Sequence, residues 1–185
     1  MIFPHTESRR IALQPASTGD SSLFMQTLLR TGLESFRPAA STVGMFKILN
    51  AAFLVLKRSS DDVLGFATLH GLDPAGHLRC GIYLDPPKTR FGIGAEATNL
   101  LLNYAFACFN IDRVVAQTTE ASFDAFGLGH GDGRERQVLA EHLWFRGQLW
   151  DLHTFQIRRD EWEEHIDLRL DGILPAPLNW RTAPR

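Results

Sequence analysis

Cysteine and net charge are both scarce in this chain of 185 residues, and each scarcity excludes a class of protein. Cys80 and Cys108 are the only two cysteines, and both fall in apolar segments. We therefore expect two core thiols, no disulfide framework and a cytoplasmic protein. A formal net charge of −2 argues against a general nucleic-acid binder, because such a protein needs a basic face.

Long apolar runs, internal repeats and low-complexity tracts are also missing. No stretch is long and apolar enough to span a membrane, and the first seven residues lack a signal-peptide pattern, so we expect no membrane partner. We also predict no metal site. The length suits one domain with a full core, which we place at residues 1–170, followed by an irregular, proline-rich tail at 171–185.

The most informative stretch is residues 80–108. The apolar run at 80–84 predicts a strand, and two prolines end it because proline offers no N–H to a ladder. Residues 91–95 predict a tight turn whose glycines tolerate unusual dihedrals and let a ligand approach the backbone. From Ile93 onwards the apolar residues follow helical spacing on one face. Unpaired N–H groups and the positive end of the helix dipole then meet at one point, which favours phosphate binding.

Several glycine motifs compete for this turn. The Walker pattern needs Lys and then Ser or Thr after its second glycine, but Gly94 is followed by Ala95 and Glu96. The dinucleotide fingerprint needs a third glycine where Ala97 stands, although alanine is sometimes allowed there. An ordinary glycine turn in front of a core helix is the alternative that involves no ligand.

Residues 89–94 resemble the pyrophosphate loop of the GNAT acetyltransferases, which is usually written Arg/Gln-x-x-Gly-x-Gly/Ala. Here they read Thr-Arg-Phe-Gly-Ile-Gly, so a hydroxyl stands where a longer polar side chain is expected, while Lys88 and Arg90 supply positive charge. The resemblance implies that acetyl-CoA, or another acyl-CoA, binds at this loop. The residues implied to bind it are Ile82, Leu84, Thr89, Arg90, Phe91, Gly92, Ile93, Gly94, Ala95 and Thr119.

The remaining pattern predicts strands at 9–17, 53–58, 63–70, 77–84 and 113–119, and helices from Thr18, from about Ala39 to Asn50, and from Ile93. The strand at 113–119 should lie parallel to the one at 77–84, with the helix as crossover. The GNAT resemblance implies an α+β fold (α/β mixed), with a mostly antiparallel sheet flanked by helices. It also implies that the two parallel strands splay apart, leaving main-chain groups free for the pantetheine arm.

The C-terminal part strengthens the resemblance. Residues 119–122 stand where the RimJ/RimL branch of the GNAT family usually has Asn-x-x-Ser, so Thr119 replaces an asparagine that contacts the pantetheine arm. Residues 139–155 look like the closing hairpin of that branch, and 158–162 look like its final segment. Phe126 lies near the place where many GNATs carry a tyrosine, which removes a phenolic proton donor there.

The RimL-like pattern implies two catalytic residues. Glu141 matches a carboxylate that can take the proton from an acceptor amine, and Ser122 matches a hydroxyl proposed to protonate the leaving thiolate. The alternatives are that Glu141 faces solvent and that Ser122 only caps a short helix. His142 is a rival base, since neutral imidazole accepts protons near pH 7. Successive strand residues point to opposite faces, so we predict that Glu141 and His142 do not both face the cleft.

The acceptor side is expected to involve the same hairpin. The residues predicted to contact the acceptor are His142, Trp144 and Asp151. His153 shares a strand face with Asp151, but we interpret it as a packed edge residue. Of Trp144, Phe145 and Trp150, one or two are expected to line the acceptor cleft and the others to pack in the core.

These features predict an acyltransferase that moves an acetyl group from acetyl-CoA to a primary amine by direct attack. The acceptor would be a small-molecule amine or a protein N-terminus. The alternative is a GNAT-fold module that binds an acyl-CoA without turnover, which Thr119 and Phe126 favour. A nucleotide-binding regulatory domain rests on the glycine turn alone. The sequence leaves open whether the chain forms a homodimer.

Overall fold

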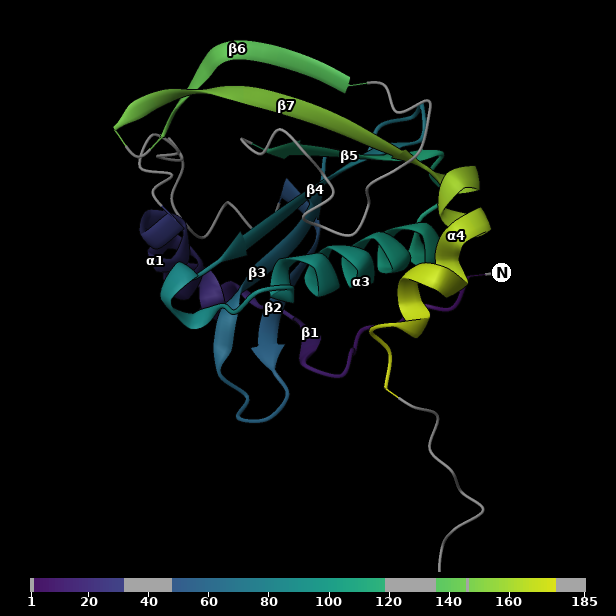
Figure 1. Ribbon diagram of the computed structural model, residues 1–185, viewed down its shortest axis with the longest axis horizontal. Helices are drawn as coiled ribbons and strands as arrows, with labels where there is room; N and C mark the ends of the chain where they lie inside the picture. The colour runs from purple at the N-terminus through teal and green to yellow at the C-terminus, as the bar shows by residue number, and fades with distance from the viewer. Residues whose placement is uncertain (1, 32–47, 119–135, 146, 176–185) are drawn as a thin grey trace, which may run out of the picture.

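Seven strands form one mixed sheet in the computed structural model, which describes residues 2–31, 48–118, 136–145 and 147–175 (Figure 1). The strands are β1 (Ile11–Pro15), β2 (Leu49–Lys57), β3 (Val63–His70), β4 (His77–Leu84), β5 (Arg113–Thr118), β6 (Arg136–Phe145) and β7 (Gln148–Arg158). Their order is β1-β2-β3-β4-β5-β7-β6. Only the β4–β5 pair is parallel, so the sheet has the predicted, mostly antiparallel form.

Helices flank both faces of this sheet. They are α1 (Ser21–Thr31), which follows the 3₁₀ turn η1 (Thr18–Asp20), α3 (Ile93–Cys108), which follows η3 (Pro86–Lys88), and α4 (Arg159–Asp171). The long α3 is the crossover between the parallel strands and lies across the sheet beside α4 (Figure 1). None of the helices in the described ranges is both long and apolar enough to cross a membrane.

Two apolar clusters lie on the two faces. The larger one holds α3 and α4 against the sheet, with Leu101 and Trp162 completely buried. The smaller one joins Phe24 and Leu28 of α1 to Phe66 of β3. Phe66 points to one face and its neighbour Ala67, which belongs to the larger cluster, points to the other. The helix α1 therefore covers the face opposite to α3.

Most of the predicted elements are confirmed. The strands at 63–70 and 77–84 have the predicted bounds, and the strand after α3 is parallel to β4. A capping box between Ser17 and Asp20 starts the 3₁₀ turn η1 at Thr18, the residue from which a helix was predicted.

Two predictions are wrong. The helix expected to end at Asn50 conflicts with β2, which already begins at Leu49 because Leu49 pairs with His70; the earlier part of that helix, from Ala39, lies outside the described residues. Cys108 is exposed at the last turn of α3 and is not a core thiol.

A buried carboxylate ties the start of α3 to the N-terminal segment. Glu96 is 7 % exposed, and it accepts hydrogen bonds from the Ser8 hydroxyl at 2.5 Å and from Arg10 Nε at 2.6 Å. Arg10 also donates through Nη1 to the Phe91 carbonyl oxygen at 3.1 Å. A negative charge in the first turn complements the helix dipole. Glu96 and Arg10 therefore hold the turn at residues 91–92 against β1.

We expect Glu96→Ala to lower the free energy of unfolding by about 2–3 kcal/mol, because Ser8 and Arg10 lose a charged acceptor. Denaturant unfolding measures this change. The matched control is Glu163→Ala, since Glu163 lies exposed on α4 and its one ion pair among the described residues is with Arg159, at 3.5 Å. That control should shift stability by about 0.5 kcal/mol or less. Equal effects of the two variants would contradict the anchoring role of Glu96.

Candidate functional site

The parallel strands β4 and β5 separate after a short stretch of pairing. They pair from His77–Arg113 to Cys80–Ala116 and no further. Each strand keeps its other neighbour beyond that point, because β4 pairs with β3 up to Leu84 and β5 pairs with β7 up to Thr118. The gap is therefore held open by intact strands, and in the described part of the chain the β4 main-chain groups beyond Cys80 have no ladder partner on β5.

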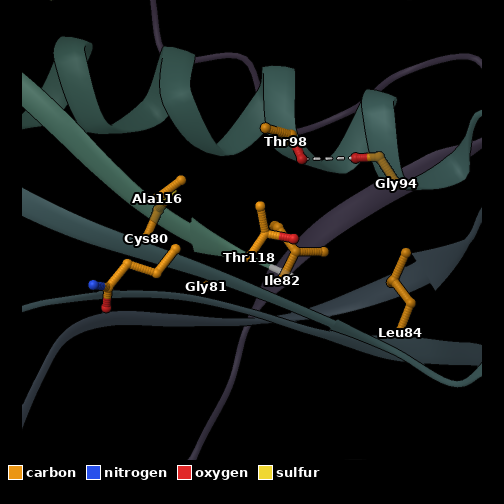
Figure 2. A pocket seen from close by; sticks show the side chains of 9 residues that line it. Cys80, Gly81, Ile82, Leu84, Gly94, Thr98, Ala116 and Thr118 are labelled. Carbon is orange, nitrogen blue, oxygen red and sulfur yellow. Dashed lines mark hydrogen bonds between the residues drawn. The ribbon is translucent and has the colours of Figure 1, made fainter. Parts of the chain in front are cut away.

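A pocket of about 180 Å³ lies in this gap, beneath the first turns of α3 (Figure 2). Its lining comes from three elements: Cys80, Gly81, Ile82 and Leu84 of β4, Ala116, Gln117 and Thr118 of β5, and Gly94 and Thr98 of α3. The Thr98 hydroxyl donates to the Gly94 carbonyl oxygen at 2.8 Å, as the dashed line shows. The lining is mixed, with apolar side chains beside exposed backbone, which suits a narrow ligand that carries amide groups.

The turn before α3 leaves backbone donors free. Gly92 has φ of 83°, and a side chain there would meet Arg10 Nη2 at 2.8 Å. The Ile93 N–H binds the Arg90 carbonyl oxygen and the Glu96 N–H binds that of Gly92. Among the described residues, the N–H groups of positions 94 and 95 have no such acceptor, as expected in a first helical turn. An anion can bind there.

The second glycine of the turn acts differently from the prediction. Gly94 lies inside α3 and is not among the residues with positive φ, so no unusual dihedral requires it. It lines the pocket instead, where the missing side chain leaves room.

The polar side chains that precede the turn are only partly available to a ligand. Thr89 turns its hydroxyl back to the Asp85 carbonyl oxygen at 3.2 Å. Lys88 Nζ donates to the Val63 carbonyl oxygen at 3.2 Å and lies 3.9 Å from the Asp85 carboxylate. Arg90 is exposed, and Phe91 is 98 % exposed. Of the two predicted cations, Arg90 is thus the one whose side chain is exposed and makes no hydrogen bond or ion pair with the described part of the chain.

The predicted cofactor residues divide into three groups. Ile82, Leu84 and Gly94 line the pocket, and the residues of the turn lie at its α3 end. Thr119, and with it Ser122 and Phe126, lies outside the described residues. The contacts of these residues with a cofactor stay predictions.

The predicted acceptor residues lie on the β6–β7 hairpin and not in the pocket lining. Glu141, His142, Trp144 and Asp151 are all exposed. The pairing of β6 with β7 shifts between Leu139 and Leu143, so simple alternation does not apply at Glu141 and His142, and which of the two faces the cleft stays a prediction. At this bulge Glu141 has φ of 48°, and its N–H donates to the Asp151 carboxylate at 3.0 Å.

The other hairpin predictions need correction. His153 is 5 % exposed, so it is packed as expected, but β7 is an inner strand and His153 is not an edge residue. Trp144 is 56 % exposed and Trp150 is half-buried, so neither packs in the main core. The side chain of Phe145 lies outside the described part of the structure.

Two residues that line the pocket were not predicted from the sequence. Cys80, expected in the core, lines the pocket, although burial raises the pKa of its thiol to about 12. Thr98 lines it one helical turn after Gly94. The signals were present, because Cys80 shares a strand face with Ile82 and Thr98 follows Gly94 by four residues.

A second row of residues on β4 faces the opposite way, toward α1. Arg30 of α1 donates through Nη1 to Asp85 at 2.8 Å, and the Asp85 side chain is buried. Tyr83 packs edge-on against Phe24 of α1, with ring centroids 5.6 Å apart. One strand therefore contributes to the pocket with one face and to the α1 side with the other.

Comparison with known proteins shows which family this chain belongs to. The family model described as acetyltransferase (GNAT) domain matches residues 10–122. A search of curated proteins gives no match. Spermidine/spermine N-acetyltransferase SpeG from Vibrio cholerae, solved in mutant forms, superposes with a TM-score of 0.69 at 16% identity, covering 85% of this chain and 98% of that chain.

Two other solved structures give the same result. A GCN5-related N-acetyltransferase from Brucella melitensis has a TM-score of 0.62 at 20% identity, with 98% of this chain and 91% of that chain covered. The ribosomal alpha-N-protein acetyltransferase RimL, solved with coenzyme A, has a TM-score of 0.62 at 13% identity, with 87% of this chain and 99% of that chain covered. At these identities the likeness concerns the fold. Because the family model spans more than half of the chain, the protein belongs to the GNAT acetyltransferase family.

Proposed function

We propose that this protein transfers an acetyl group from acetyl-CoA to a primary amine by direct attack of the amine on the thioester. The observation that carries the proposal is the pocket between the separated strands, at the start of α3. A phosphate group needs N–H donors, and an amide-rich arm needs both backbone donors and acceptors. Here the N–H groups at the start of α3 lie beside the β4 backbone that has no partner on β5.

The cofactor would lie along this pocket. Its pyrophosphate would accept hydrogen bonds from the N–H groups of Gly94 and Ala95, with Arg90 beside it. Its pantetheine arm would pass through the gap. There it would form hydrogen bonds with the backbone of Ile82 and Leu84, in place of the missing pairing with β5. Positioning of both substrates in one gap supplies much of the rate enhancement in a direct transfer.

We infer a small-molecule amine or a protein N-terminus as the acceptor, and a place in the RimL-like branch. The similar structures support an amine, since SpeG is named a spermidine/spermine N-acetyltransferase and RimL an alpha-N-protein acetyltransferase. Both acceptors offer a primary amine, which must lose a proton during the transfer.

Glu141 is our candidate for the base that takes this proton. A residue other than glycine at φ of 48° is strained, and strained residues at bulges are often found beside active sites. The Asp151 carboxylate holds the Glu141 N–H and so fixes this conformation. Ser122 is our candidate for a second proton-transfer group, by its place in the sequence pattern alone.

The first prediction concerns the cofactor. Gly94→Trp should abolish binding of acetyl-CoA, measured by calorimetry, because the indole would fill the pocket at the helix start. Gly172→Trp is the matched control, since a side chain at Gly172 meets no atom within 4 Å. Wild-type affinity in a folded Gly94→Trp variant would contradict the proposed site.

The second prediction uses Cys80 as a reporter of occupancy. In a Cys108→Ser variant, the remaining thiol should react slowly with N-ethylmaleimide at neutral pH, because the pKa of Cys80 is raised to about 12 and the thiolate is the nucleophile. Its rate should rise about tenfold for each pH unit between pH 7 and 10 while the protein stays folded. Saturating acetyl-CoA should slow the reaction further. The Cys80→Ser variant, which keeps the exposed Cys108, should show no such protection.

The third prediction concerns the base. Glu141→Gln should reduce turnover by roughly 10²–10⁴-fold and leave acetyl-CoA affinity unchanged, because the base contacts the acceptor. The wild-type pH–rate profile should rise through one apparent pKa, and this limb should flatten in the variant.

Three results would change this assignment. Loss of the limb in His142→Gln, but not in Glu141→Gln, would make His142 the base. An unchanged limb in both variants would exclude the two residues. Binding of acetyl-CoA without transfer to any amine in a broad panel would favour a binding module over an enzyme.

A further inference from the structure

Basic side chains gather on the α1 face of the sheet, where the parallel strands β4 and β5 begin. Arg79 shares a face of β4 with Tyr83, which packs against α1. His77, two residues before Arg79, pairs with Arg113 of β5, and Arg113 pairs with Arg158 of β7. Paired residues on adjacent strands point to the same face. The three arginines and His77 therefore lie together, and we call these four residues the basic cluster.

Carboxylates compensate two members of the basic cluster. Arg158 donates through Nε to the Asp160 carboxylate at 3.0 Å, and a second Arg158 nitrogen binds the other oxygen of that carboxylate. His77 Nδ1 lies 3.2 Å from the Asp73 carboxylate. These two members of the cluster therefore have acidic partners within the chain itself.

The other two members have no acidic partner among the described residues. Arg113 donates through Nη1 to the neutral side-chain oxygen of Gln156 at 2.9 Å, and its Nε is buried without a hydrogen-bond partner. Arg79 is exposed, and its side chain forms no ion pair or hydrogen bond with the described part of the chain. Like charges on neighbouring strands repel each other, and a buried donor without an acceptor is costly. An anion bound here would relieve both costs.

The basic cluster lies beside the point where the gap opens. The pairing of β4 with β5 ends at Cys80, so Arg79 is one residue before the gap. Gly81 and Gln117 follow Arg79 and Val115 by two residues on the same face, and both line the pocket. Two residues of a strand span about 7 Å. A ligand of that length can therefore contact the basic cluster with one end and enter the gap with the other.

We propose that Arg79 and Arg113 bind an anionic group of the acyl acceptor, so that the preferred acceptor is a primary amine that also carries a carboxylate or a phosphate. This assignment rests on the acetyl transfer proposed above and narrows its acceptor. Guanidinium groups suit both anions, because they donate paired N–H groups to two oxygens. The amine would lie at the gap while the anion stays on the arginines. A polycation such as spermidine would be repelled by the same charges.

The test compares acceptors that differ only in the anion: 4-aminobutyrate with butylamine, and O-phosphoethanolamine with ethanolamine. The wild type should show a kcat/KM about tenfold or more higher for at least one of the acids, and the two pairs tell a carboxylate from a phosphate. Arg79→Gln and Arg113→Gln should each reduce this preference toward one, with the Kd for acetyl-CoA unchanged. Arg58→Gln is the matched control, because Arg58 follows β2 and donates to the Ser8 carbonyl oxygen. It should keep the preference.

A second measurement does not depend on turnover. In ¹⁵N-labelled protein saturated with CoA, the preferred acid should move the amide resonances of residues 77–79 and 113–115, and its uncharged counterpart should leave them in place. Equal kcat/KM values for acids and uncharged counterparts in the wild type, or an unchanged preference in both arginine variants, would overturn the anionic acceptor and leave the acetyl transfer standing. Failure of the wild type to acetylate any amine would contradict the proposed function, whereas shifts of these resonances would then still support an anion site.

Discussion

The separation of β4 from β5 is the constraint on which the other features of this protein depend. A parallel pair needs a crossover, and here α3 makes that crossover on one face of the sheet. Because the pairing ends at Cys80 and Ala116, the same helix starts over an open gap and not over a closed ladder. The β4 backbone that has no partner on β5 thereby lies next to the N–H groups at the start of α3. Neither the strand nor the helix alone would place these two kinds of group together.

This gap stays open because its edges are fixed elsewhere. β3 holds β4, and β7 holds β5, so neither strand needs the other for its hydrogen bonds. The helix start is fixed by Glu96, whose buried carboxylate binds Ser8 and Arg10. Fixed edges matter for a transferase, because a preformed site lowers the entropy cost of bringing two substrates together.

The strand β4 contributes to both sides of the sheet. Ile82 and Leu84 face the pocket under α3, whereas Tyr83 and Asp85 contact Phe24 and Arg30 of α1. An alternating strand can therefore line the pocket with one set of residues and pack against α1 with the other.

Local patterns in the sequence predicted much of this fold. Apolar runs bounded by turn residues predicted β3 and β4, and the glycine turn followed by regular apolar spacing predicted the start of α3. Leu49 was misassigned because its place in β2 is set by pairing with His70, which a local pattern does not contain.

The site was predicted less completely, because it depends on register between strands. The bulge at Glu141 arises from the pairing of β6 with β7, which alternation along β6 alone does not predict. Cys80 was assigned to the core although it shares a strand face with Ile82, because the sequence does not show where the pairing of β4 with β5 ends.

Amide hydrogen exchange with and without acetyl-CoA tests the binding site most directly. The cofactor should slow exchange in two segments that are distant in sequence, residues 81–84 of β4 and residues 92–95 at the start of α3. The turn between β2 and β3, residues 58–62, should be unaffected. Binding of acetyl-CoA without protection in either segment would show that the cofactor lies elsewhere and would contradict the assignment of the gap as its site.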